Sequence, residues 1–425
     1  MASILFITLA VLLVFNIPIA VALGLSAIAA ITFGNTPIPP LVVAQRMFTS
    51  VDSFPFMAIP FFMLAGGLME GGGISKRLIN FAQSLVGPIP GGLGIITVVA
   101  SAFFGAISGS NPATVAAIGG IMIPAMIKAG YPKSFAAAVA AAAGTLGVII
   151  PPSIPMVTYG VVASVSIGDL FIAGIVPGLL MAVSLCLIIV FYAKKMNLRG
   201  GEKLSLKRIL RTGIDAIWAL FMPVIILGGI YGGVFTPTEA AAVAVVYAFL
   251  ISFFVYKELK IKDLRQIIPK AGISTSIVMF VIATSQSFSW LITSEQIPAL
   301  VANTMLAISD NVFVITLLIN VLLLFLGTFL ETQAIILLIT PILLPLAAKI
   351  GVDPLLLGII IVVNTSAGMI TPPMAVNLFV ACGITNIKIE QISRTIIPFL
   401  VAELITIILI TNFPGISMSL LHLLK

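Results

Sequence analysis

Two stretches of this chain decide its fold: Gly144-Thr145-Leu146-Gly147-Val148-Ile149-Ile150-Pro151-Pro152-Ser153 and Asn364-Thr365-Ser366-Ala367-Gly368-Met369-Ile370-Thr371-Pro372-Pro373. Each interrupts a long apolar run with small and hydroxyl residues followed by two adjacent prolines. A proline has no amide donor and clashes with the preceding helical turn, so each pair ends a helix. In hydrocarbon the carbonyls freed in this way must find other partners. The two stretches therefore predict two broken helices at membrane depth.

The surrounding composition is that of an integral membrane protein. Of 425 residues, 60% are hydrophobic and 8% are charged, whereas soluble domains carry about a quarter charged residues. A spanning helix needs about 20 apolar residues, so the length allows roughly ten to fourteen membrane-crossing elements. The alternating ten-residue pattern of an outer-membrane barrel is absent from the sequence. We therefore expect an all-α polytopic membrane protein.

The chain repeats itself at a shift of 221 residues. This shift aligns Pro124 with Pro345, Gly147 with Gly368, and the first proline pair with the second. The matches cluster at helix breakers, where backbone geometry is most restricted. Residues 54–192 and 275–413 are thus predicted duplicates, and an odd number of crossings separates their starts. Inverted repeats with interrupted helices are the way in which secondary transporters build one site that can face either side.

Each copy also contains a short polar interruption between two apolar runs. The first is Ser108-Gly109-Ser110-Asn111-Pro112-Ala113-Thr114, and the second is Gly327-Thr328-Phe329-Leu330-Glu331-Thr332-Gln333. These segments are too short to be solvent loops, so we interpret 91–127 and 312–348 as re-entrant hairpins and the polar segments as their tips. Charge alone does not reject two full spans in place of the first hairpin.

The predicted organisation has five parts. They are N-terminal scaffold spans (1–53), a first repeat (54–192) with hairpin 91–127 and broken helix 134–165, basic loops with central scaffold spans (193–271), a second repeat (272–413) with hairpin 312–348 and broken helix 354–383, and a tail (414–425). Residues 3–33 are long for one crossing and short for two. A break at Asn16-Ile17-Pro18 would place the N-terminus outside, and an unbroken helix would place it in the cytoplasm.

The basic residues are distributed as the positive-inside rule requires. With both hairpins in place, 18 of the 21 basic residues fall on the cytoplasmic side, and Arg46, Lys349 and Lys425 fall outside. We attribute the net charge of +7 to this topology rather than to nucleic-acid binding.

The sequence lacks the residues that several classes of protein function require. The single histidine is His422, the two cysteines are Cys186 and Cys382 in apolar runs, and no G-x-x-x-x-G-K-[ST] loop occurs. Metal clusters, haem, disulfide frameworks and ATP hydrolysis are therefore not expected. A Ser-His dyad cannot form around Ser108, so an intramembrane enzyme is excluded. A passive channel or an uncoupled organic-anion permease stays open as an alternative, although two dead-ended hairpins favour occlusion.

The tips and breaks predict ion chemistry. Hydroxyls and freed carbonyls suit a hard monovalent cation, and half-helices that point their N-termini inward favour an anionic substrate. Neither hairpin and neither break contains Lys or Arg. A carboxyl at membrane depth is a functional candidate by default, which applies to Glu331 and Glu403. For Glu239 we favour a helix cap, because it follows Thr236-Pro237-Thr238.

The segment Gly232-Gly233-Val234-Phe235-Thr236-Pro237-Thr238-Glu239-Ala240-Ala241 resembles the signature of the large membrane subunit of TRAP transporters, the tripartite ATP-independent periplasmic carriers. The resemblance runs essentially end to end and includes the Ser108–Thr114 tip and both proline breaks. It implies a sodium-driven importer of organic acids in the bacterial inner membrane. In this elevator-type fold, the hairpins and broken helices form a transport domain that moves against a scaffold of the remaining spans.

The resemblance also implies site residues and partners. One sodium site would involve Ser108, Ser110, Asn111, Gly144, Val148 and Pro151, and a second would involve Gly327, Thr328, Gly368, Thr371 and Met374. The substrate would lie near Asn111, Thr114, Ser153, Glu331 and Thr332. Sodium would be the only cofactor, with no organic cofactor. The partners would be a small four-span membrane subunit and a periplasmic substrate-binding protein, neither fused here. Sialic acid is the favoured substrate and a C4-dicarboxylate the next.

Overall fold

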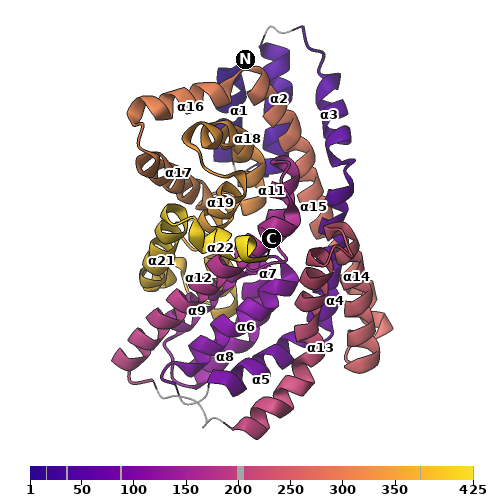
Figure 1. The fold of residues 1–425 in the computed structure, drawn as a ribbon, viewed down its shortest axis with the longest axis vertical. Helices are drawn as coiled ribbons and strands as arrows, with labels where there is room; N and C mark the ends of the chain where they lie inside the picture. The colour runs from indigo at the N-terminus through magenta and orange to yellow at the C-terminus, as the bar shows by residue number, and fades with distance from the viewer. Residues whose placement is uncertain (16, 35–36, 87–88, 199–204, 374, 425) are drawn as a thin grey trace.

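The computed structural model describes residues 1–15, 17–34, 37–86, 89–198, 205–373 and 375–424. Every regular element in these ranges is helical, which confirms the all-α class. Figure 1 shows an elongated bundle in which α1, α2 and α16 lie at one end and α5, α8 and part of α13 at the other. Of the predicted N-terminal break, Asn16 lies outside the described residues, and two separate helices flank it: α1 (Ala2–Val14) and α2 (Ile19–Phe33).

The remaining helices follow in two series. The first comprises α3 (Leu41–Val51), a 3-10 turn (Phe54–Met57), α4 (Ala58–Gly71), α5 (Ile74–Val86), α6 (Gly92–Ser108), α7 (Asn111–Thr114), a π-helical turn (Val115–Gly119), α8 (Gly120–Lys128), α9 (Lys133–Gly144), α10 (Leu146–Ile149), α11 (Ile154–Val162) and α12 (Ile167–Lys195). The second comprises α13 (Leu206–Tyr231), α14 (Pro237–Leu250) with a π-helical turn (Ile251–Val255), α15 (Ile261–Ser294), α16 (Ile297–Ile308), α17 (Val312–Gly327), α18 (Thr332–Ile350), α19 (Pro354–Gly368), α20 (Val376–Thr385), α21 (Ile389–Asn412) and α22 (Gly415–Leu424).

The 221-residue repeat is visible in the helix boundaries. Shifted by 221, the start of α9 at Lys133 coincides with the start of α19 at Pro354. The start of α7 at Asn111 coincides in the same way with the start of α18 at Thr332. The helix breakers that align in the sequence therefore end and begin equivalent helices in space.

Fewer helices are long enough to cross a membrane than the length estimate suggested. Seven described helices are sufficiently long and apolar, or eight if the bent pair Lys133–Ile149 and Ile154–Val162 is one span. The other apolar helices are shorter, with 10–17 residues. The difference from ten to fourteen crossings arises because several apolar runs form helices of 10–17 residues, among them α6 and α17 before the tips and α20 after the second break.

The breaks interrupt helices where the proline pairs stand. The first separates α10 from α11 with a bend of 41°, and the second separates α19 from α20. The Pro151–Pro152 and Pro372–Pro373 bonds are both cis. The broken helices pack inside the bundle: α9 contacts α6, α20 and α21, and α19 contacts α17, α18 and α21. The freed backbone groups are thus surrounded by protein, as hydrocarbon requires.

A second packing group surrounds α15. This helix contacts α2, α3 and α4, while α14 packs on α4 and α13 packs on α5. Arg77 on α5 ties the amphipathic α5 helix to this group: its guanidinium lies 2.7 Å from Glu258 Oε1 and 3.8 Å from the centre of the Tyr256 ring. Thr212 Oγ1 on α13 also donates to Ser84 Oγ on α5 at 2.8 Å. The segment that leads from α4 into the first hairpin is therefore fastened to α13 and to the loop before α15.

Candidate functional site

The first tip and both helix breaks meet through buried hydrogen bonds. Asn111, at the first tip, is fully buried, and its Nδ2 donates to Ser366 Oγ at 2.7 Å. Ser366, in the second break, donates in turn to the carbonyl oxygen of Thr145 in the first break at 2.7 Å. Segments more than 200 residues apart in sequence thus form one network.

Glycines allow the tips and breaks to approach closely. A Cβ on Gly147 would lie 2.5 Å from the carbonyl oxygen of Ser110, so the first break touches the first tip. A Cβ on Gly368 would lie 2.5 Å from the Cα of Gly327, so the second break touches the end of α17. Backbone atoms cannot move aside as a flexible side chain can, which explains why both breaks carry glycine at this position.

A small cavity of about 30 Å³ lies between the two tips. The first tip and first break contribute Ser110, Asn111 and Val148, and the second tip contributes Glu331 and Thr332. Three of the five predicted substrate residues therefore line one cavity. Its lining, as far as the structure describes it, contains no Lys or Arg.

A larger cavity of about 650 Å³ adjoins the first tip and includes Ser108 and Ser110. Its opposite wall is formed by α4 and α15, which contribute Glu70, Gln266 and Lys270. The part of α15 that lines it follows the basic loop before Ile261, so the cavity lies toward the end of α15 that is next to this loop. Lys270 places a basic group in this cavity, although the tips themselves have none.

The residues of the first predicted cation site lie close together. The Ser108 hydroxyl is 3.0 Å from Thr114 Oγ1, and Thr114 Oγ1 also donates to the Ser110 carbonyl oxygen at 2.8 Å. A Cβ on Gly144 would lie 3.4 Å from the carbonyl oxygen of Asn111. Pro151 belongs to the break that contains Val148. The tip and the break thus bring hydroxyls and backbone carbonyls together, which is the ligand chemistry that a hard cation prefers.

The second predicted cation site is partly described. Gly327 lies against Gly368, the Thr371 amide donates to the Gly368 carbonyl oxygen at 2.9 Å, and Thr371 Oγ1 donates to the Ala367 carbonyl oxygen at 2.9 Å. Thr328 Oγ1 donates to the Phe325 carbonyl oxygen at 2.7 Å. Met374 lies outside the described residues.

Two predicted substrate residues do not line the cavity between the tips. Thr114 is buried and bonds within the first tip. Ser153 accepts a hydrogen bond from the Met156 amide at 3.4 Å and caps α11. In this structure both side chains form hydrogen bonds to nearby backbone groups of the tip or of α11.

The residue-by-residue prediction missed several groups. Ser366 and Thr145 join the two breaks, while Gln333 and Met369 line the cavity beside the tips. One sequence signal was available for the first pair, since the 221-residue shift places the hydroxyl of Thr145 opposite that of Ser366. Nothing in the sequence indicated that the two would be bonded to each other.

The structure confirms Glu239 as a helix cap. Its Oε2 accepts from the Thr236 amide at 2.8 Å, and its own amide donates to Thr236 Oγ1 at 3.3 Å. This reciprocal capping box begins α14.

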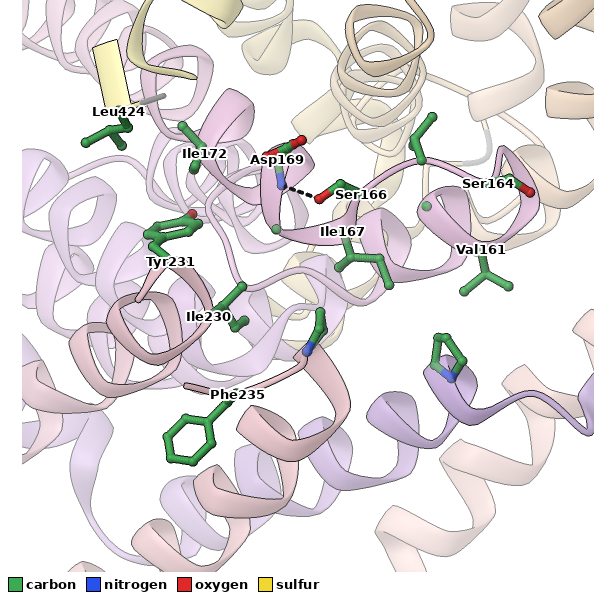
Figure 2. Close-up of a pocket in the computed structure, with 15 residues that line it drawn as sticks. Val161, Ser164, Ser166, Ile167, Asp169, Ile172, Ile230, Tyr231, Phe235 and Leu424 are labelled. Atoms are coloured by element: carbon green, nitrogen blue, oxygen red, sulfur yellow. Dashed lines mark hydrogen bonds between the residues drawn. The ribbon is translucent and has the colours of Figure 1, made fainter. Parts of the chain in front are cut away.

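A cavity of about 810 Å³ lies away from the tips, between the α11–α12 turn and the α13–α14 loop. Figure 2 shows that mostly apolar side chains line it, including Ile167, Ile230 and Phe235, and that the Asp169 amide donates to Ser166 Oγ. No residue of either tip or either break contributes to its lining. The candidate site is therefore the smaller cavity, which residues of both repeats line.

The family model described as "Tripartite ATP-independent periplasmic transporter, DctM component" matches residues 6–416. This chain belongs to the DctM family. It is accordingly a TRAP transporter large permease, a multi-pass inner-membrane protein and not an enzyme.

Relatives of this DctM-family chain carry names for different substrates. It is 48% identical over 412 residues to the isethionate TRAP transporter permease protein DctMQ of Oleidesulfovibrio alaskensis. This match covers 96% of the present chain and 64% of the length of that protein. It is 41% identical to the C4-dicarboxylate TRAP transporter large permease protein DctM of Rhodobacter capsulatus, and that match covers 100% of this chain and 99% of the other. It is 40% identical to the sialic acid TRAP transporter large permease protein SiaM of Vibrio cholerae, with 89% and 88% covered.

The DctM-family fold also has a solved counterpart. The crystal structure of the Alcanivorax borkumensis YdaH transporter matches with a TM-score of 0.63 at 15% sequence identity, and the match covers 89% of this chain and 88% of the other. At this identity the match concerns the fold alone. The two chains therefore share a fold over most of their length.

Proposed function

We propose that this chain is the large permease subunit of a sodium-coupled importer for an organic-acid anion and that it works by an elevator mechanism. The observation that carries the proposal is the cavity between the two tips, which both repeats line. A site shared by two related halves can open to either side of the membrane when one packing group moves against the other. The moving group would contain α6–α12 and α17–α22, and the fixed group would surround α15.

Sodium coupling is supported by the ligand chemistry of the site. Ser108, Ser110 and Asn111 bring hydroxyl and carbonyl oxygens against the first break. The second break offers the Thr371 hydroxyl beside the close contact of Gly327 with Gly368. Neutral oxygen ligands without a carboxylate cage suit a monovalent cation better than a divalent one.

An anionic substrate is supported by the helix N-terminus at the cavity and by the basic side chain in its approach. The helix α18 begins at Thr332, which lines the cavity, so the positive end of its dipole faces a bound ligand. Lys270 stands in the adjoining cavity. The names of the relatives include a sulfonate, a dicarboxylate and a carboxylated sugar, so we assign the substrate to the organic anions. The chain is more similar to the isethionate protein than to the sialic acid protein, which does not favour sialic acid as the substrate.

The partners follow from family membership. A TRAP large permease works with a small membrane subunit and a periplasmic binding protein, and we propose the same two partners here. The binding protein would deliver the anion to the external side. The anion would leave on the cytoplasmic side through the cavity of about 650 Å³ that adjoins the first tip.

Reconstitution tests the proposal directly. The purified chain, its small subunit and its binding protein should be placed in liposomes, and uptake of radiolabelled isethionate, succinate and sialic acid should be measured. Saturable uptake that requires both an inward sodium gradient and the binding protein supports the proposal. Flux that does not saturate and needs neither component would indicate a passive channel and would overturn it.

A further inference from the structure

Glu403 is a buried acid for which the proposed sodium and substrate sites have no role. It lies on α21, its side chain is fully buried, and its Oε1 is 2.8 Å from Thr145 Oγ1. Its Oε2 has no hydrogen-bond partner among the described residues. A carboxyl group at membrane depth that is left half unpaired is energetically expensive and requires an explanation.

No cation in the described chain compensates this acid. The helices packed against α21 are α9, α12, α17, α19, α20 and α22. The charged or titratable side chains on these helices and at the α19 and α21 caps are Lys133, Asp169, Cys186, Tyr192, Lys194, Lys195, Asp353, Cys382, Lys388, Glu390, Arg394 and His422. None of them forms an ion pair with Glu403 in the described ranges.

The basic groups on α21 and α9, the two helices that carry Glu403 and lead into Thr145, are remote from the carboxyl group. Arg394 precedes Glu403 by nine residues, or about 13 Å along a helix at 1.5 Å per residue. Lys133 precedes Thr145, the hydrogen-bond partner of Glu403, by twelve residues, or about 18 Å.

The hydrogen-bond geometry suits a protonated carboxyl. Thr145 Oγ1 lies 2.7 Å from the Ala142 carbonyl oxygen, to which it can donate its single hydrogen. With that hydrogen given to Ala142, a lone pair on Thr145 Oγ1 can accept a hydrogen bond from a protonated Glu403 Oε1, and the same 2.8 Å separation is kept. The unpartnered Oε2 becomes a neutral carbonyl oxygen, which costs far less to bury than an ionised carboxylate.

Glu403 is also connected to the first predicted sodium site. Its partner Thr145 follows Gly144 directly, and the Thr145 carbonyl accepts from Ser366, which accepts from Asn111. A sodium ion held by Asn111 and Gly144 would introduce a positive charge close to the carboxyl group. A nearby positive charge favours the ionised form of an acid.

The acid occurs in one repeat alone. The position equivalent to Glu403 under the 221-residue shift is Ala182 on α12. The equivalent position in the first repeat is thus occupied by an alanine, so the repeated architecture does not itself require a carboxyl group there.

We propose that Glu403 is a proton-binding site linked to the first sodium site, and that sodium binding releases its proton to water. The inference rests on the proposed function, because it requires sodium to bind between the tip and the break. Since linkage is reciprocal, protonation of Glu403 weakens sodium binding. Acidic solution therefore lowers the affinity of the carrier for sodium.

The test measures sodium binding to the purified full-length chain by titration with sodium chloride against choline chloride at pH 6 and pH 8. For the wild type, we expect the dissociation constant to be about fivefold higher at pH 6, the lower end of typical coupling between two sites. Glu403→Gln retains an N–H donor for Thr145 and mimics the protonated acid, so its affinity should be nearly independent of pH. The matched control is Glu390→Gln, an exposed acid on the same helix, which should behave as the wild type.

A second measurement uses the wild type alone and does not depend on the folding of a variant. A pH indicator in weakly buffered solution should report up to one proton released per chain when sodium is added. Sodium binding that is independent of pH and releases no proton would overturn this inference alone. Loss of one bound sodium in Glu403→Gln would also overturn it, because Glu403 would then be a sodium ligand. Absence of any sodium binding would overturn the proposed function, and this inference with it.

Discussion

The hydroxyl of Ser366 donates a hydrogen bond to the backbone carbonyl of Thr145 at 2.7 Å, and the two residues occupy equivalent positions 221 residues apart. The two halves of the repeat therefore meet at matching points of their broken helices. The tip residue Asn111 joins the same hydroxyl from the other side. A change in one break thus reaches the other break through a single side chain.

Removing this hydroxyl should destabilise the chain. Ser366→Ala leaves the Thr145 carbonyl without a partner and leaves the Asn111 amide only Met369 Sδ as an acceptor, and a buried unsatisfied group costs about 1–3 kcal/mol. The melting temperature of the detergent-purified protein should fall. Ser276→Ala is the control, because its exposed hydroxyl bonds only to the Gly272 carbonyl of its own helix. Equal melting temperatures for the two variants would contradict the predicted role of Ser366.

The glycine contact in the second break should not tolerate a methyl group. In Gly368→Ala the new Cβ would lie 2.5 Å from the Cα of Gly327, and overpacking of this kind costs about 1–3 kcal/mol. We expect lower stability and much slower reconstituted uptake, because the added methyl group forces the break and the end of α17 apart at the second predicted sodium site. Gly383→Ala on α20 meets no atom within 4 Å and should preserve uptake. Normal transport in Gly368→Ala would show that this contact is dispensable.

The hydroxyls assigned to the sodium sites should set the sodium requirement. Ser110→Ala and Thr371→Ala each remove one oxygen near a break, and a lost bond to a charged group costs about 1.5–3 kcal/mol. The sodium concentration for half-maximal uptake should rise about tenfold, which corresponds to about 1.4 kcal/mol. Thr304→Ala removes an exposed hydroxyl that bonds within its own helix and should leave the requirement unchanged. If the sodium dependence of both site variants equals that of Thr304→Ala, these hydroxyls are not ligands.

The sidedness of the cavities can be measured by cysteine labelling. Gln266 lines the cavity next to the first tip, and Thr49 lines a separate cavity of about 500 Å³ with Arg46. In a background without Cys186 and Cys382, a membrane-impermeant maleimide should label Gln266→Cys from the cytoplasmic face and Thr49→Cys from the outside. Right-side-out and inverted vesicles supply the two conditions. Labelling of Gln266→Cys from the outside would reverse the proposed orientation.

Local backbone chemistry explains why much of the fold was predictable. Two adjacent prolines remove two amide donors at one place, and the pairs at Pro151 and Pro372 both lie between the end of one helix and the start of the next. Glu239 was predictable as a cap for the same reason, because a capping box involves residues three apart. The expected number of crossings exceeded the seven described helices that are long and apolar enough to span, because several apolar runs form helices of 10–17 residues.

Amino-acid order alone determined the membrane class, the two breaks, the two polar tips and the family. Each of these depends on composition, or on residues adjacent in the chain. Only the tertiary structure decided that Asn111, Ser366 and Thr145 form one hydrogen-bonded network, and that Glu403 reaches the same break from α21. The physical reason is that a hydrogen bond depends on atoms within about 3 Å in space, and the packing of α21 against α9 brings together residues 258 positions apart.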